Sequence, residues 1–164
     1  MTGHHVGPVA PVVVPVDLGP VRLAAPAEGM RRFSGRHGRM WQWVGDGQPL
    51  LNLSVAARTT QLGDATGVSH HLTWELAQAV GRLDGEADHE VERDLLVPVA
   101  GARAHRAGRV TGTVHGLDVR TTVVVTTDGA LMHVLQLTVD DSDAGRDTER
   151  AVLGSIEVRA GQEP

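Results

Sequence analysis

The sequence predicts an α+β domain in which an antiparallel β-sheet carries helices on both faces, as in an α/β/α sandwich. Three observations lead to this prediction. Turn residues join alternating apolar segments into two β-hairpins, apolar residues recur at helical spacing in two other segments, and both faces of the second hairpin are apolar enough to require a cover. At 164 residues with 41% hydrophobic residues, the chain has room for one domain with a sizeable core.

Residues 1–20 form a proline-rich segment that we expect to be extended. Proline lacks an amide donor and fixes φ, so the four prolines of this segment disfavour a helix and favour a tail or an edge strand. Alternating valines give such a strand one face that can dock; they are Val12, Val14 and Val16. The domain itself is expected to span residues 21–159, beginning with a short strand that ends at Pro26, and residues 160–164 form a tail.

The first predicted hairpin joins residues 40–44 to residues 50–55. Asp46-Gly47 supplies the positive-φ residues that a tight two-residue turn requires. The pairs that this turn predicts are Trp43 with Leu50 and Trp41 with Asn52.

Trp41, Trp43 and Leu50 would share one face of this hairpin, and they are the best candidate for a partner-binding surface. Tryptophans bury a large area at low entropic cost, so a pair of them on an open face is typical of a partner anchor. The alternative is that a helix covers the rings, which then fill a core otherwise built from Val, Leu and Ala. The opposite face would serve the core, with Leu51, Leu53 and Val55.

The second predicted hairpin joins residues 117–126 to residues 131–139 through Asp128-Gly129. One face carries Val119, Thr121, Val123 and Val125 with Met132, Val134, Gln136 and Thr138. The other face carries Arg120, Thr122, Val124 and Thr126 with Leu131, His133, Leu135, Leu137 and Val139. Because neither face is cleanly polar, we expect this ribbon to lie at the centre of the sheet, covered on both sides.

Two segments have the pattern of helices. The first begins at Ser69 as N-cap and stops at Gly85, with an apolar face of Leu72, Leu76, Ala79, Val80 and Leu83. The second begins near Ser142 or Asp143 and carries Ala144, Ala151 and Val152, although Gly145 and Gly154 weaken it. Residues 90–99 and 102–114 are predicted as further strands, and residues 156–158 as a short closing strand.

Composition excludes several kinds of chemistry. The chain has no cysteine, so thiolate nucleophiles, disulfides and Cys-ligated metals are ruled out, and it has no lysine for a Schiff base or a P-loop. A net charge of −5 argues against a phosphate-binding surface, and hence against a nucleic-acid partner. The chain also contains no nucleophile elbow, dinucleotide-binding or kinase motif, so we expect no enzyme activity and no cofactor.

The expected location is the cytoplasm. Residues 1–5 lack the positive charge of a signal peptide, and prolines interrupt the apolar run at residues 9–16. No apolar run approaches the roughly 18 residues of a membrane-spanning helix. We expect a protein or peptide partner, or a second copy in a homodimer, and no membrane span.

The closing part of the sequence resembles that of PsbP-like domains. Residues 133–139, an acidic turn, an alanine-containing helix and residues 152–158 follow the order strand, helix and a "leucine, any, Ser-Ile, any, Val" tail. Residues 99–103 resemble the start of a mid-domain strand of that family. The resemblance spans Val21 to Val158, and it implies an antiparallel sheet with helices on both faces.

The resemblance also implies a binding function. The superfamily includes the photosystem subunit PsbP, a Ran-binding nuclear-import factor, LpqN-type lipoproteins and bacterial chaperones for secreted effectors. This chain departs from the lipoprotein branch in lacking the lipid-attachment cysteine, and we expect it to differ from the photosystem branch in having no transit peptide. We therefore expect a non-catalytic adaptor or secretion-type chaperone. The alternative is a small-molecule or metal-dependent site lined by histidines.

His133 is the histidine most typical of a polar site, because it interrupts an apolar strand face. A buried imidazole needs hydrogen-bond partners, and Arg120 and Asp118 on the partner strand are the candidates. Metal binding is not expected: His70 and His71 are adjacent on a helix and project about 100° apart. A metal site would require that neighbouring strands bring His105, His115 and His133 together.

Overall fold

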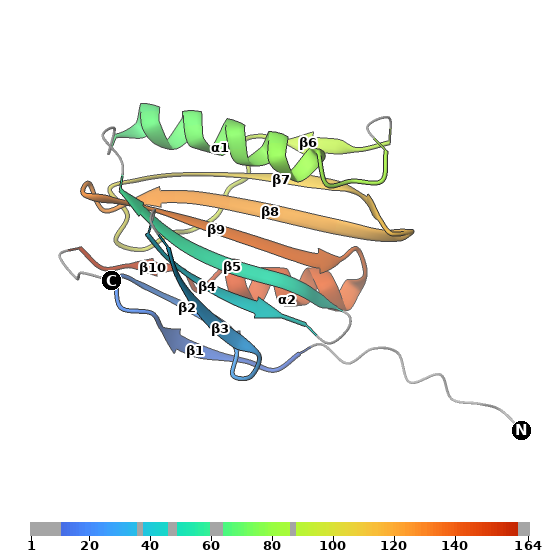
Figure 1. The fold of residues 1–164 in the computed structure, drawn as a ribbon, viewed down its shortest axis with the longest axis horizontal. Helices are drawn as coiled ribbons and strands as arrows, with labels where there is room; N and C mark the ends of the chain where they lie inside the picture. The colour runs from blue at the N-terminus through green and yellow to red at the C-terminus, as the bar shows by residue number, and fades with distance from the viewer. Residues whose placement is uncertain (1–10, 36–37, 46–48, 60–63, 86–87, 161–164) are drawn as a thin grey trace, which may run out of the picture.

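The computed structural model describes residues 11–35, 38–45, 49–59, 64–85 and 88–160, which form ten strands and two helices (Figure 1). The strands are β1 (Val13–Asp17), β2 (Val21–Pro26), β3 (Met30–Gly35), β4 (Gly38–Val44), β5 (Leu50–Thr59), β6 (Glu90–Glu92), β7 (Ala104–Val114), β8 (Leu117–Thr127), β9 (Leu131–Asp140) and β10 (Glu157–Val158). The helices are α1 (Ala65–Val80) and α2 (Asp143–Leu153).

Most of the strands belong to one antiparallel sheet of seven, in the order β3-β4-β5-β9-β8-β7-β6. The β8–β9 hairpin lies at its centre, as the sequence predicts. Thr127 pairs with Met132, so the turn is longer than the two residues expected, and Gly129 adopts a φ of 100° within it. Asp128 holds this turn by accepting hydrogen bonds from the backbone N–H groups of Ala130 and Leu131.

Helix α1 covers one face of the large sheet over β7 and β8. Val68, Leu72 and Leu76 of the helix form a buried cluster with apolar residues of the three strands β7, β8 and β9. The sheet residues of this cluster are Val110, Val123, Val125, Met132 and Val134. Gly108 of β7 allows close packing here, since a Cβ at that position would collide with the Leu76 side chain.

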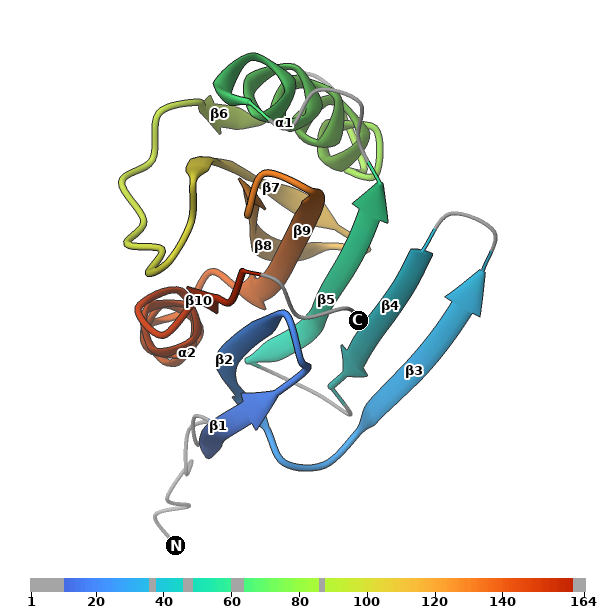
Figure 2. The same ribbon diagram turned by 90° about the vertical axis from the view of Figure 1, so that its left-hand side faces the viewer.

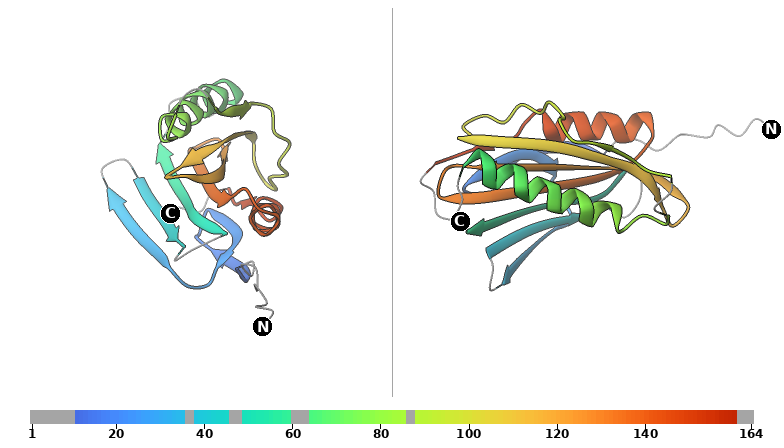
Figure 3. Two further views of the ribbon diagram at one scale, coloured as in Figure 1. Left: turned by 90° about the vertical axis from the view of Figure 1, so that its right-hand side faces the viewer. Right: turned by 90° about the horizontal axis from the view of Figure 1, so that it is seen from above.

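The opposite face is covered by α2 together with a second, three-stranded sheet in the order β1-β2-β10 (Figures 2 and 3). The larger hydrophobic cluster lies here and includes Leu23, Leu135, Leu137 and Val152. The predicted sandwich is therefore met only in part. Each face has one helix, but strands supply much of the second cover, because Val21, Leu23 and Ala25 of β2 are buried in this cluster.

The register predicted for the β4–β5 hairpin is wrong. Trp43 pairs with Leu53 and Trp41 with Val55, three residues from the expected partners. An odd shift moves every side chain of one strand to the other face of the sheet relative to its partner. Leu53 and Val55 consequently lie on the same face of the sheet as the two tryptophans. The expected turn at Asp46-Gly47 lies outside the described residues.

Both helices predicted from the sequence are present, but the ends of α1 differ from the predicted ones. α1 begins four residues before Ser69, because Asp64 is the N-cap and accepts a hydrogen bond from the Gly67 N–H at 2.9 Å. It ends at Val80 with Gly81 as C-cap, before Gly85. α2 begins where predicted, with Ser142 as N-cap.

The remaining strands are mostly as expected, with shorter bounds. β1 is an edge strand that pairs with residues 22–26 of β2. Val16 packs on the core with Val13, whereas Val12 is 81% exposed, so the valine alternation does not mark one docking face.

β6 stops at Glu92, residues 99–103 contain a turn in place of the start of a strand, and β10 closes the fold. None of the described helices is long and apolar enough to cross a membrane.

Candidate functional site

A groove of about 560 Å³ lies between α1 and the strands β4, β5 and β9. It exists because α1 sits over β7 and β8, which leaves this face of the neighbouring strands open (Figure 2). We call it the α1 groove. Its walls and floor are formed by Met40, Gln42, Asn52, Ser54, Ala56, Arg58, Trp74, Glu75, Ala77, Gln78, Gly81, Arg82, Val134 and Gln136.

The floor of the α1 groove carries amide and hydroxyl groups in register. Gln42, Ser54 and Gln136 lie directly opposite one another on β4, β5 and β9. Asn52 lies on the same face, two residues before Ser54. Its Oδ1 atom is buried without a hydrogen-bond partner among the described residues. Side-chain amides both donate and accept hydrogen bonds, so this floor can bind groups of either kind.

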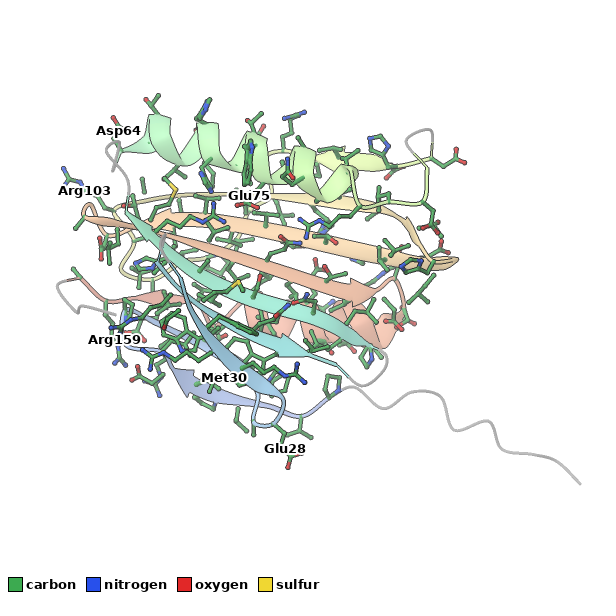
Figure 4. All side chains as sticks on the ribbon, viewed as in Figure 1. Glu28, Met30, Asp64, Glu75, Arg103 and Arg159 are labelled. Carbon is green, nitrogen blue, oxygen red and sulfur yellow. The ribbon has the colours of Figure 1, made fainter. Side chains whose placement is uncertain are left out.

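One end of the α1 groove is a charged and aromatic cluster from α1 and β5. Glu75 is buried, and its Oε1 atom lies 3.2 Å from His71 Nε2 and 3.6 Å from the Arg58 guanidinium. The guanidinium also lies 5.8 Å from the ring centre of Trp74. Figure 4 shows Glu75 on the helix above the sheet. Arg58 lies at the mouth of the groove, where 39% of its side chain is exposed.

The other end of the α1 groove is closed by Arg82. Its Nη2 donates to Oε1 of Gln136 at 3.2 Å, and its Nε donates to the carbonyl of Gln78 at 3.2 Å. His71 Nε2 lies within hydrogen-bond distance of both Arg58 Nη1 and Glu75 Oε1, and it either accepts from the first or donates to the second, depending on its tautomer. Among the described residues, no hydroxyl group is hydrogen-bonded to His71, so no nucleophile of that kind is placed beside this His–Glu pair.

A second polar cluster lies beneath α2, where Glu149 reaches the large sheet. The Glu149 carboxylate accepts hydrogen bonds from Thr122, from Arg109 at 3.0 Å and from Arg120 at 3.2 Å. Arg120 also pairs with Asp141 at 3.3 Å. These contacts connect α2 to β7 and β8. They neutralise the arginines within the protein, so we assign them a structural role.

Trp41, Trp43 and Leu50 do not form an open surface. Trp41 is 5%, Trp43 1% and Leu50 4% exposed, and all three belong to the larger hydrophobic cluster. The Trp43 indole donates to the carbonyl of Pro26 at 3.0 Å. The prediction of a tryptophan ledge on the surface is therefore wrong, and the alternative that the rings fill the core is correct.

His133, Arg120 and Asp118 are not brought together either. His133 is 2% exposed and lies beside the turn that contains Asp128, whereas Arg120 pairs with Val139 near the other end of the hairpin. Asp118 accepts a hydrogen bond from Thr113 on β7. The register explains the error: Arg120 pairs with Val139 and Thr126 pairs with His133, so Arg120 and His133 lie six residues apart along the strands.

The histidines do not converge. His105 and His133 lie on either side of Thr126 in one row across the sheet, but His115 lies in the turn at the far end of β7. Within the described ranges, no three His, Cys, Asp or Glu side chains are placed to hold a metal ion. The absence of a bound metal remains a prediction.

The residues of the α1 groove were missed at the sequence level. The available signal was the polar alternation of Gln42, Asn52, Ser54 and Gln136 in otherwise apolar strands. The wrong register for β4 and β5 scattered these residues over both faces, so the pattern could not be recognised.

The solved structures confirm the family resemblance at the level of the fold. The solution structure of cyanobacterial PsbP (CyanoP) from Synechocystis sp. PCC 6803 matches with a TM-score of 0.54 and 15% sequence identity, over 97% of this chain and 98% of that chain. The fold is PsbP-like. At this identity, the similarity concerns the fold alone.

Two further matches are weaker. A protein from Bacteroides thetaiotaomicron VPI-5482 matches with a TM-score of 0.48 and 11% identity, over 87% of this chain and 46% of that chain. A mutant of the protein Mog1 matches with a TM-score of 0.46 and 12% identity, over 87% and 86%. No family model and no curated protein matches the sequence.

Proposed function

We propose that the chain is a non-catalytic, PsbP-like domain that binds a polypeptide segment in the α1 groove. The observation that carries the proposal is the row of Gln42, Ser54 and Gln136 across three adjacent strands. Amide side chains have the same donors and acceptors as a peptide backbone, so an extended chain laid over them can be satisfied without pockets for particular side chains.

The ends of the groove indicate which segment fits. Trp74 is 48% exposed and offers an aromatic surface to an apolar side chain. Arg82 favours an acidic group at one end, because its hydrogen-bond partners are the uncharged Gln78 carbonyl and Gln136 amide. At the other end, the charge of Arg58 is largely offset by Glu75. We propose an extended segment with apolar and acidic residues as the ligand.

An adaptor or secretion-type chaperone in the cytoplasm is the role that we propose for such a domain, with no cofactor. The histidine-lined small-molecule or metal site has less support. His105 and His115 are exposed, and His133 does not line the α1 groove.

The test is selection of short linear peptides from a displayed random library on the whole chain. We expect the selected peptides to be rich in acidic and apolar residues and to lose binding on Ala77→Trp, which fills the groove from an exposed helix position. Ala151→Trp is the matched control, because Ala151 is an exposed alanine on α2. Peptides that bind the two variants equally would place the binding site elsewhere and overturn the proposal.

A further inference from the structure

The outer edge of β3 is an open strand edge. β3 ends the seven-stranded sheet and pairs only with β4 in the described part of the chain. Its side chains from Met30 to Ser34 are all exposed, although they include apolar residues; Met30 is 47% and Phe33 44% exposed. Figure 2 shows β3 at the margin of the molecule, and Figure 4 labels Met30, its first residue. Among the described residues, nothing pairs with the outer edge of β3, and its side chains are accessible on both faces, although Arg32 also lies 5.5 Å from the ring centre of Trp41.

This edge is also the most basic part of the chain. Between Glu28 and Asp46 the sequence has four arginines and no acidic residue, whereas the whole chain has a net charge of −5. Arg31 lies opposite Gln42, on the face of the α1 groove, and Arg32 lies opposite Trp41, on the other face. The ion pairs found between described residues do not involve either of them.

We propose that β3 binds an extended acidic segment of another protein by strand addition. Edge N–H and C=O groups supply the backbone hydrogen bonds, as in other β-augmentation complexes. Neighbouring residues of an added strand point to opposite faces of the sheet. Because Arg31 and Arg32 also point to opposite faces, acidic residues at odd and at even positions of the ligand both meet an arginine. Met30 and Phe33 provide apolar contacts beside them.

The same charges argue against a second copy as the occupant. A two-fold antiparallel pair of β3 strands brings the arginines of the two copies opposite or next to one another, and like charges across a strand pair are destabilising. Arginines on an edge strand are a common protection against self-association. Here they exclude the identical strand and favour an acidic one. Nucleic acids and anionic membranes share the charge but have no strand edge to pair with β3.

The experiment uses the whole chain and a labelled synthetic peptide of alternating Glu and Val, about as long as a typical strand. We expect saturable binding at about 0.15 M salt and little binding of the Lys–Val counterpart. Amide hydrogen exchange should slow at alternate residues of β3, since only every second residue of an edge strand directs its backbone groups outward. N-methylation of alternate peptide amides should abolish binding for one of the two methylation patterns and leave it for the other.

Variants separate this site from the rest of the surface. All Glu side chains of the alternating peptide lie on one face of an added strand, so they face either Arg31 or Arg32. The double variant Arg31→Glu, Arg32→Glu covers both registers and should weaken binding by about tenfold or more, because the favourable charge pairs on that face become repulsive. Arg93→Glu, Arg103→Glu is the control with the same change of charge, at two exposed arginines outside β3, and it should bind as the unmodified chain does. Ala77→Trp fills the α1 groove, where a peptide of this kind is also proposed to bind, and it should leave the slowed amide exchange in β3 unchanged. Failure of the groove proposal and failure of this one are therefore distinguishable.

Several results would overturn the proposal. Equal binding by both double variants would show that β3 is not the site, and equal binding of both N-methylated peptides would show that no backbone pairing occurs. Tighter binding of single-stranded oligothymidine or of anionic vesicles, without slowed exchange in β3, would assign the basic edge to phosphate. A dimer in sedimentation that disappears in the Arg31→Glu, Arg32→Glu variant would assign it to a second copy.

Discussion

His133 Nε2 lies 3.7 Å from Asp128 Oδ2, and both side chains are almost completely buried. This separation is too long for a hydrogen bond, so the contact is purely electrostatic. Burial lowers the pKa of His133 below its ordinary 6.5, against the opposing effect of Asp128. Burial alone would raise the pKa of Asp128, but the backbone N–H groups of Leu131 and Ala130, together with His133, lower it below 3.8.

The pair predicts that the protein is destabilised by mild acid. The unfolded chain takes up a proton at His133 near pH 6.5, whereas the folded chain resists it, so the stabilising contribution is present above about pH 6.5 and is lost as the pH falls towards the lowered pKa. The free energy of unfolding should decrease over this range, and His133→Leu should reduce the decrease. His70→Leu, at an exposed histidine, is the control. An unchanged pH dependence in His133→Leu would contradict this assignment.

Loss of the Glu149 carboxylate should lower the free energy of unfolding. Glu149→Ala leaves Arg109 and Arg120 beneath α2 without their shared carboxylate, and breaking a buried ion pair in this way costs about 3–5 kcal/mol. Asp147→Asn on the exposed side of α2 should change the free energy of unfolding by less than about 0.5 kcal/mol, because exposed pairs contribute little. Urea denaturation measures both. Similar midpoints for the two variants would refute a structural role of Glu149.

The two hairpins show which part of a sheet can be predicted from sequence. In β8–β9 the observed register differs from a two-residue turn by two residues, as the pairing of Thr127 with Met132 shows. An even shift leaves each side chain on its predicted face, so the central position and the mixed faces of this hairpin were predicted correctly. In β4–β5 the shift is three, so residues 52–55 of β5 lie on the opposite face from the one predicted relative to the tryptophans, whereas Leu50, before the bulge, is buried with them.

The α1 groove depends on tertiary placement that no local pattern contains. The apolar stripe of α1 was recognisable, but the half of the large sheet that it covers was not, because the wrong β4–β5 register hid the polar face of β4 and β5. The glycines of β7 distinguish the two halves: Gly108 and Gly112 leave room for Leu76 and Leu83, so the helix sits over β7 and leaves β4 and β5 open. Such steric complementarity between distant segments cannot be inferred from one sequence.

Burial separates two tryptophans that the sequence does not distinguish. Trp43→Ala should lower the free energy of unfolding by about 3–5 kcal/mol, because the ring is 1% exposed and its indole is hydrogen-bonded. Trp74→Ala should cost about 1 kcal/mol or less, since the ring is 48% exposed and contacts Arg58 at the surface. Urea denaturation distinguishes the two. A large loss for Trp74→Ala would mean that the groove wall is part of the folded core.

Gly145→Ala should destabilise the protein, although helix propensity alone predicts the opposite. In an exposed helix, replacing glycine by alanine stabilises by about 1 kcal/mol. Gly145 lies in the first turn of α2, and a Cβ there would collide with the backbone carbonyl and the side chain of Asp140, the last residue of β9. Its N–H also donates to the Ser142 N-cap at 3.1 Å.

The backbone at Asp140 cannot move away freely, because its N–H donates to the Pro49 carbonyl at 2.9 Å. We therefore expect Gly145→Ala to lower the free energy of unfolding by about 1–3 kcal/mol, the usual cost of overpacking. Gly85→Ala is the control, since a Cβ there meets no atom within 4 Å, and it should have an effect within about 0.5 kcal/mol. Thermal and urea denaturation of both variants provide the measurement. Stabilisation by Gly145→Ala would show that α2 does not approach β9 as closely as the structure has it.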